Sequence, residues 1–234
     1  MSRERILPAF LCEFLNPSMP AILTLQNLTK SYSGRLVLSV PAVDIAPGIH
    51  WLKGQNGFGK TTLFKVIAGL LPYAGTVLLD GQFDLRRHPV AYRLRVNYGE
   101  AEPVYPEFLT GWELIHWVAT AKQAPQHQVD ALIDRFAVAD FLKTPVGTYS
   151  SGMLKKVSII MAFLGNPRLI LLDEPLITLD QQATHLVAEL IQTGREQGIS
   201  FLLSSHQDFS LSGLPVESVW QVAQQTLTLV PHTV

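Results

Sequence analysis

The sequence predicts an α/β fold built around a parallel sheet. A glycine-rich stretch at residues 54–62 separates a strand-like segment, 49–52, from a segment with a helical pattern, 63–68. Two later apolar runs, 168–172 and 199–203, are separated by a helical segment and end in polar residues. Continuous apolar runs of this length are typical of strands that are buried on both faces by helices. The alternation of such strands with helices predicts an α/β architecture.

Shorter elements complete the predicted fold. The remaining expected strands are 22–28, 36–40, 43–45, 73–81, 96–98, 216–222 and 226–230. We expect the early strands to form an antiparallel β subdomain beside the central sheet. Residues 110–142 change to a helical period and predict a small α-helical insertion, and residues 151–164 predict a further helix.

The first 20 residues differ from the rest of the chain. An apolar segment after Arg5 is faintly similar to a signal peptide, but it is short, contains Pro8 and ends at Glu13. We expect a disordered extension over residues 1–20, and a start codon upstream of the true one is an alternative explanation. Residues 21–234 are expected to form one domain, with the helical subdomain at about residues 100–150.

Composition limits the function classes. The chain has 234 residues, of which 47% are hydrophobic and 16% charged, so part of its surface is expected to be covered by a partner. Its formal net charge is −1 and no basic cluster is present, which argues against a nucleic-acid partner. No apolar run is long enough to predict a membrane-spanning helix. The single cysteine, Cys12, indicates a chain without an internal disulfide.

The glycine-rich stretch fits the phosphate-binding pattern G-x-x-x-x-G-K-[ST] in full. Its glycines allow successive backbone N–H groups to point into one hollow at the start of a helix, where an anion binds well. A chance Gly-rich turn is the alternative, but the flanking strand and helix argue against it. Lys60 is expected to reach the outer phosphates and the Thr61 hydroxyl to bind Mg²⁺. The predicted ATP-binding residues of this loop are Gly54, Gln55, Asn56, Gly57, Phe58, Gly59, Lys60, Thr61 and Thr62.

Polar side chains follow the two buried strands. Asp173 and Glu174 end the first of them, and His206 comes shortly after the second. Ligands of open α/β sheets bind at this edge, so a magnesium nucleotide accounts for both carboxylates. Asp173 is expected to hold Mg²⁺, Glu174 to polarise the attacking water, and His206 to contact the terminal phosphate. Capping or a solvated turn is the alternative role for each of these residues.

A second anion site is predicted where the helix near residue 150 begins. Ser150, Ser151, Gly152 and Met153 combine two hydroxyls, a glycine and the free N–H groups of a helix start. An ordinary serine N-cap would explain the same residues. A chain with a phosphate loop needs no second phosphate site of its own, which indicates a site shared between two copies.

In this order the motifs resemble those of the ATP-binding subunit of ABC transporters. Residues 54–62 resemble the Walker A loop and residues 169–175 the Walker B strand, with its glutamate at Glu174. Residues 149–153 are similar to the signature motif, and His206 to the switch histidine. Tyr32 corresponds to the aromatic residue that stacks on adenine in the family. The resemblance covers about residues 21–234 and implies a P-loop NTPase (RecA-like) core.

The resemblance implies ATP hydrolysis with Mg²⁺ in a head-to-tail dimer. Each ATP would lie between the phosphate loop of one copy and the signature of the other. The signature has Ser151 for the first glycine and Met153 for glutamine, and Thr178 replaces a usual glycine after Walker B. The usual glutamine of the loop after the 96–98 strand falls at Ala101, and Glu100, which we favour, or Glu102 can take its place.

The resulting functional prediction is an ATP hydrolase that powers export through a separate integral membrane subunit. The second nucleotide-binding subunit is a copy of this chain or a related one, at the cytoplasmic face of the membrane. A soluble ABC-type ATPase acting on nucleic acid or translation is the alternative, and a P-loop kinase is a third possibility. Such soluble proteins usually carry two fused domains or basic arms, which this chain lacks.

Overall fold

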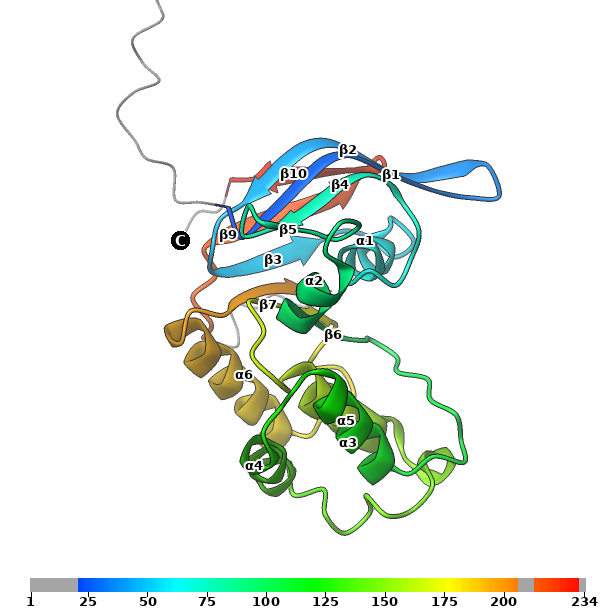
Figure 1. The fold of residues 1–234 in the computed structure, drawn as a ribbon, viewed down its shortest axis with the longest axis vertical. Helices are drawn as coiled ribbons and strands as arrows, with labels where there is room; N and C mark the ends of the chain where they lie inside the picture. The colour runs from blue at the N-terminus through cyan, green and yellow to red at the C-terminus, as the bar shows by residue number, and fades with distance from the viewer. Residues whose placement is uncertain (1–20, 206–212, 232–234) are drawn as a thin grey trace, which may run out of the picture.

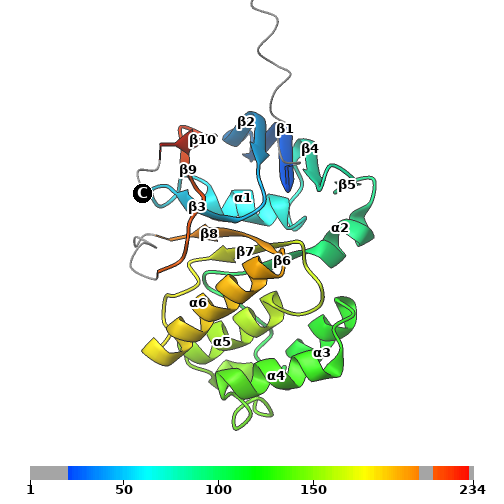
Figure 2. The same ribbon diagram turned by 90° about the vertical axis from the view of Figure 1, so that its left-hand side faces the viewer.

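The computed structural model describes residues 21–205 and 213–231, which form three layers (Figures 1 and 2). Figure 2 shows an antiparallel sheet, then helix α1 with the second sheet below it, and then a layer of helices. The predictions for residues 1–20 and for His206 fall outside the described residues. None of the helices in the described ranges combines the length and the hydropathy that crossing a membrane requires.

The central sheet has six strands in the order β10-β9-β3-β8-β7-β6. Strands β9, β3, β8, β7 and β6 run parallel to one another, and β10 pairs antiparallel with β9 at the edge. All five residues of β7 and of β8 are buried, as expected for parallel strands covered on both faces. The bounds are Ile49–Lys53 (β3), Val96–Gly99 (β6), Leu169–Asp173 (β7), Ser200–Ser204 (β8), Ser218–Ala223 (β9) and Thr226–Val230 (β10).

The second sheet is antiparallel, with the order β2-β1-β4-β5. It contains β1 (Leu23–Tyr32), β2 (Arg35–Ile45), β4 (Ala74–Leu79) and β5 (Phe83–Asp84). The prediction of separate strands at 36–40 and 43–45 is wrong, because β2 runs continuously through Pro41. Proline is tolerated there because β2 is an edge strand of this sheet, with β1 as its one neighbouring strand within the sheet.

Helix α1 (Lys60–Ile67) lies between the two sheets (Figure 2). Its Leu63, Phe64, Val66 and Ile67 are fully buried in a core shared with both sheets. The adjoining helix α2 (Pro89–Arg95) did not stand out in the sequence, since only Tyr92 of its seven residues is buried. The Tyr92 hydroxyl donates to the Ile67 carbonyl oxygen at 2.8 Å and so fixes α2 against the end of α1.

The other face of the central sheet carries the remaining helices (Figure 1). They are α3 (Gly111–Ala121), α4 (Gln126–Phe136), the short 3₁₀ helix η1 (Val146–Thr148), α5 (Ser151–Ala162) and α6 (Gln181–Glu196). A second apolar core joins these helices to the sheet. The α/β fold with an antiparallel sheet and a helical insertion is therefore confirmed, and its helical part places the start of α5 beside the central strands.

Candidate ATP site

The phosphate loop joins β3 to α1. Gly57 and Gly59 have φ angles of +81° and +101°, which residues with a side chain rarely adopt, and Gly59 is the N-cap of α1. Lys60 begins the helix and is 7% exposed. Its Nζ donates to the Gly54 carbonyl oxygen at 2.6 Å, so the ammonium group is held over the hollow of the loop.

A cleft of about 800 Å³ opens above this loop. The loop contributes Gln55, Asn56, Gly57, Gly59, Lys60, Thr61 and Thr62 to its lining. Gly54 and Phe58 do not line the cleft. A Cβ atom on Gly54 would lie 2.7 Å from the Val222 carbonyl oxygen, so this glycine permits the close approach of β9. Phe58 is 41% exposed.

The end of β7 lies against the start of α1. The Thr61 hydroxyl donates to Asp173 Oδ2 at 2.6 Å, and the hydroxyl of Ser204 donates to Asp173 Oδ1. Asp173 is 1% exposed, and these two hydroxyls hold its carboxylate in one orientation. Beside it, burial and the Asp173 carboxylate raise the pKa of Tyr98 well above its ordinary value, so its phenol stays neutral.

Glu174 follows Asp173 at the same edge and also lines the cleft. It is 7% exposed, and its φ angle of +46° is unusual for a residue with a side chain. Its backbone N–H donates to the carbonyl oxygen and to the hydroxyl of Ser204, both at 3.1 Å. Ser204 therefore fixes both Asp173 and Glu174.

Helix α5 begins at the far side of the cleft. Ser150 is its N-cap: the hydroxyl accepts from the Met153 N–H at 3.2 Å, while Met153 Sδ accepts from the Ser150 N–H at 3.5 Å. Ser151 is exposed and lines the cleft. A Cβ atom on Gly152 would lie 2.8 Å from the Thr178 carbonyl oxygen, so this glycine lets α5 approach the loop after β7. The serine N-cap and an exposed serine hydroxyl thus occur side by side.

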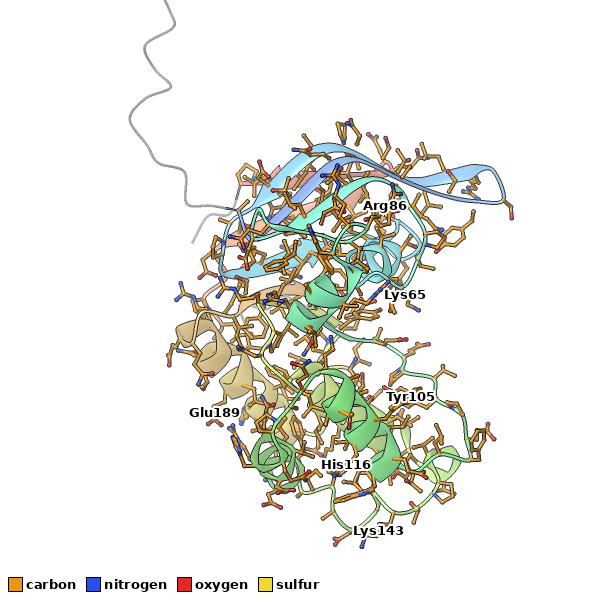
Figure 3. The ribbon with its side chains drawn as sticks, in the orientation of Figure 1. Lys65, Arg86, Tyr105, His116, Lys143 and Glu189 are labelled. Atoms are coloured by element: carbon orange, nitrogen blue, oxygen red, sulfur yellow. The ribbon has the colours of Figure 1, made fainter. Side chains whose placement is uncertain are left out.

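Besides Gly54 and Phe58, two more of the predicted ATP contacts do not line the cleft. Tyr32, at the end of β1, is 45% exposed, does not line the cleft, and has Lys30 Nζ 4.6 Å from its ring centroid. Of the acidic residues after β6, Glu102 lines the cleft and Glu100 does not. The Glu100 carboxylate lies 3.8 Å from Nζ of Lys65, which extends from α1 (Figure 3). This geometry favours Glu102 over Glu100 as the acidic residue that faces a nucleotide.

Two further residues at the site carry no motif signal. In the sequence, Ser204 directly follows the apolar run 199–203 and Lys155 lies within the expected helix 151–164, so neither fits a binding pattern. Ser204 is completely buried, and Lys155 is 2% exposed. Lys155 Nζ donates to the carbonyl oxygens of Glu100 at 2.7 Å, Ala101 at 3.1 Å and Asp173 at 3.0 Å. Only the assembled fold brings these partners together.

The sequence profile of the ABC transporter family matches residues 42–177, from β2 to beyond Glu174. The matched region includes the phosphate loop, the start of α5 and the end of β7, all of which border the cleft. The chain belongs to the ABC transporter family. Its fold is that of the family's ATP-binding subunits: it superimposes on a solved ATP-binding subunit of an ABC transporter with a TM-score of 0.79 and 28% identity, covering 88% of each chain.

Individual relatives of this ABC protein differ greatly in length. It is 32% identical over 192 residues to the ABC-type transporter ATP-binding protein EcsA of Bacillus subtilis, covering 80% of this chain and 77% of EcsA. It is 29% identical to the lantibiotic transport ATP-binding protein SrtF of Streptococcus pyogenes, covering 79% and 80%. The human phospholipid-transporting ATPase ABCA7 is 33% identical over 79% of this chain, which spans only 9% of that protein. The chain spans 48% of an uncharacterized Nostoc ATP-binding protein.

Proposed function

We propose that this ABC protein binds and hydrolyses ATP with Mg²⁺, and that two such subunits power export through a separate membrane subunit. The observation that supports hydrolysis most directly is the common cleft of Lys60, Thr61, Asp173 and Glu174. One ammonium group, one hydroxyl and two carboxylates at a glycine-rich loop are the groups that phosphoryl transfer to water requires.

The residues present fit a magnesium ion. Thr61 Oγ1 and Asp173 Oδ2 are 2.6 Å apart, and both are hard oxygen ligands of the kind that Mg²⁺ prefers. When bound, Mg²⁺ would neutralise charge on the outer phosphates of ATP. The Ser204 hydroxyl would keep the Asp173 carboxylate oriented toward Thr61.

The same geometry supports hydrolysis. Lys60 Nζ, now on the loop carbonyls, would turn to the phosphate oxygens and stabilise the charge that develops there. A water oxygen attacks the terminal phosphorus, the bond to the bridging oxygen breaks, and ADP leaves with the electron pair. The water's proton passes to the Glu174 carboxylate.

The start of α5 supports a head-to-tail dimer. Ser151 offers an exposed hydroxyl beside the first N–H groups of a 12-residue helix, where the helix dipole favours an anion. The phosphate loop already provides one such position. The second position is therefore assigned to the ATP of a partner subunit, which is another copy or a related chain.

An exposed apolar surface supports docking to a membrane subunit. Val104, Phe108 and Trp117 are 87%, 78% and 72% exposed, on the connection from β6 and on helix α3. The same connection carries Tyr105, and α3 carries His116 (Figure 3). Three large apolar side chains exposed on neighbouring parts of the chain support an interaction site here. We assign it to an integral membrane subunit at the cytoplasmic face, in agreement with the transport names of EcsA and SrtF.

Glu174→Gln tests the hydrolytic assignment. The variant should bind ATP as the wild type does, release no inorganic phosphate and accumulate as an ATP-bound dimer in gel filtration. Glu196→Gln, which removes an exposed carboxylate at the end of α6, serves as the matched control and should hydrolyse ATP normally. Normal phosphate release by Glu174→Gln would contradict the role of Glu174.

Recovery from membranes tests the coupling to transport. The tagged full chain, expressed with its native membrane proteins and solubilised in detergent, should retain an integral membrane protein. Recovery of ribosomes or nucleic acid without such a protein would favour the alternative of a soluble ABC-type ATPase. Transfer of the terminal phosphate to a small molecule would favour a kinase instead.

A further inference from the structure

Lys155 is a charged residue inside the protein. It lies in the second turn of α5 and is 2% exposed. An ammonium group has three N–H bonds, and Lys155 Nζ donates to three carbonyl oxygens, those of Glu100, Ala101 and Asp173. Its hydrogen-bonding capacity is therefore used completely by the backbone.

The three acceptors belong to two different walls of the ATP cleft. Asp173 ends β7, and its side chain is the carboxylate that accepts from Thr61. Glu100 and Ala101 begin the connection after β6, and Ala101 itself lines the cleft. Lys155 adds the third wall, because α5 begins at Ser151, which also lines the cleft. One ammonium group thus joins the starts or ends of three cleft-forming elements.

The residue type is costly at this position. Burial opposes the charged form of a lysine, and a methionine of similar length would fill the same space without that cost. Carbonyl oxygens alone do not require a full charge nearby. A permanent structural filler would therefore not need to be a lysine, whereas a group that must hold three separate backbone segments at fixed distances needs three donors on one atom.

We propose that Lys155 is a positioning residue for ATP hydrolysis, which sets the connection after β6 and the end of β7 relative to the start of α5. The inference depends on the proposed ATPase function. Lys155 Nζ donates to backbone carbonyl oxygens after β6 and at the end of β7, so its loss should change the alignment of the reacting groups more than the binding of ATP. The connection from β6 also leads to the exposed residues Val104 and Phe108, so movement of that surface would reach Asp173 through Lys155.

Lys155→Met tests this role, with Lys156→Met as the matched control. Methionine keeps the length of the side chain and removes every donor. Lys156 is the next residue of α5 and makes a surface ion pair with Asp180 at 2.8 Å, which contributes little to stability. We expect Lys155→Met to lower kcat at least about tenfold. The affinity for a non-hydrolysable ATP analogue, measured by calorimetry, should stay within about threefold of the wild type.

Amide hydrogen exchange provides a readout that does not depend on turnover. In Lys155→Met, exchange should accelerate in the peptides that cover residues 99–106 and 173–178, while the core strands keep the wild-type rate. Lys156→Met should show the wild-type pattern. Unchanged exchange in these two segments, or a loss of ATP affinity as large as the loss of kcat, would overturn the proposal.

Lys155→Arg decides the question if the methionine variant does not fold. Arginine keeps the charge, but its planar fork cannot direct three donors from one atom. A lower kcat with faster exchange in the same two segments and unchanged ATP affinity supports the positioning role. Wild-type kcat in this variant overturns it. If the wild-type protein itself releases no phosphate from ATP, the proposed function fails first and independently of Lys155.

Discussion

Replacing Ser204 with alanine tests how the carboxylates at the ends of the central strands are held. The hydroxyl of Ser204 donates to Asp173 Oδ1 and accepts from the Glu174 N–H at 3.1 Å. In the alanine variant the Glu174 N–H keeps its bond to the carbonyl oxygen of residue 204, also at 3.1 Å. Asp173 keeps its bond from Thr61 at 2.6 Å and loses the other hydroxyl partner.

The magnitude follows from that difference. A hydrogen bond to a charged group contributes about 1.5–3 kcal/mol, and Asp173 is 1% exposed, so water cannot replace the lost hydroxyl. We expect Ser204→Ala to lower the free energy of unfolding by about 2 kcal/mol. For a domain of this size each kcal/mol shifts the melting temperature by about 2–4 °C, so the shift should be about 4–8 °C.

Ser200→Ala is the matched control for this experiment. Ser200 lies on the same strand, is 1% exposed, and its hydroxyl accepts only from the neutral Gly48 N–H at 3.1 Å among the bonds that the structure describes. Its loss should cost about 1 kcal/mol. Urea denaturation at unchanged m-value measures both variants. A cost for Ser204→Ala equal to or below that of Ser200→Ala would refute the view that Ser204 supports a charged carboxylate.

Three other predictions concern the frame around the site. Burial lowers the pKa of His50 below its ordinary value of 6.5, so the unfolded chain takes up the proton first and stability falls as the pH drops below about 6.5. His50→Gln should reduce this loss of stability, measured as the difference between the free energies of unfolding at about pH 7.5 and about pH 5.5. The same difference in the variant and the wild type would contradict the prediction. Phe64→Ala should lower the free energy of unfolding by about 3–5 kcal/mol because Phe64 is fully buried between the sheets. Phe108→Ala, at a 78% exposed position, should lower it little. Similar losses of unfolding free energy for the two variants in urea denaturation would count against the role of Phe64 in this core. Gly152→Ala should destabilise the protein by about 1–3 kcal/mol, since the new Cβ atom would lie 2.8 Å from the Thr178 carbonyl oxygen. A melting temperature equal to that of the wild type would show that the loop after β7 moves aside without cost.

Local pattern was sufficient for the strands and loops that carry strong signals. The run from Leu169 to Asp173 is apolar until its last residue, and parallel strands that are buried on both faces require such a run. The glycines at 57 and 59 mark positive φ angles that few other residues adopt. These two signals predicted the edge of the sheet at which the phosphate loop and the carboxylates meet.

Other parts of the molecule depend on partners that are distant in the sequence. Helix α2 has only one buried residue, so its sequence lacks the apolar periodicity that predicts a helix. The continuous strand β2 was split in prediction because Pro41 is acceptable only at a sheet edge, and edge position is a property of the whole sheet.

The same reason applies to the candidate site. Lys155 and its acceptor Glu100 are separated by 55 positions, and Ser204 and Asp173 by 31. No local pattern shows that a lysine on a helix is buried or that a serine at the end of a strand faces a carboxylate. Residues of this kind can be found only after the helices and the sheet are packed together.

The exposed apolar side chains on α3 and on the connection from β6 also have a consequence for the living cell. Val104, Phe108 and Trp117 lie in water on the isolated chain. Copies of the chain made in excess of the membrane subunit would keep this surface uncovered and would be prone to stick to one another or to be captured by chaperones. Balanced synthesis of the two subunits would therefore protect the solubility of this protein, and a surplus of the ATP-binding chain should be cleared by proteolysis sooner than the assembled one.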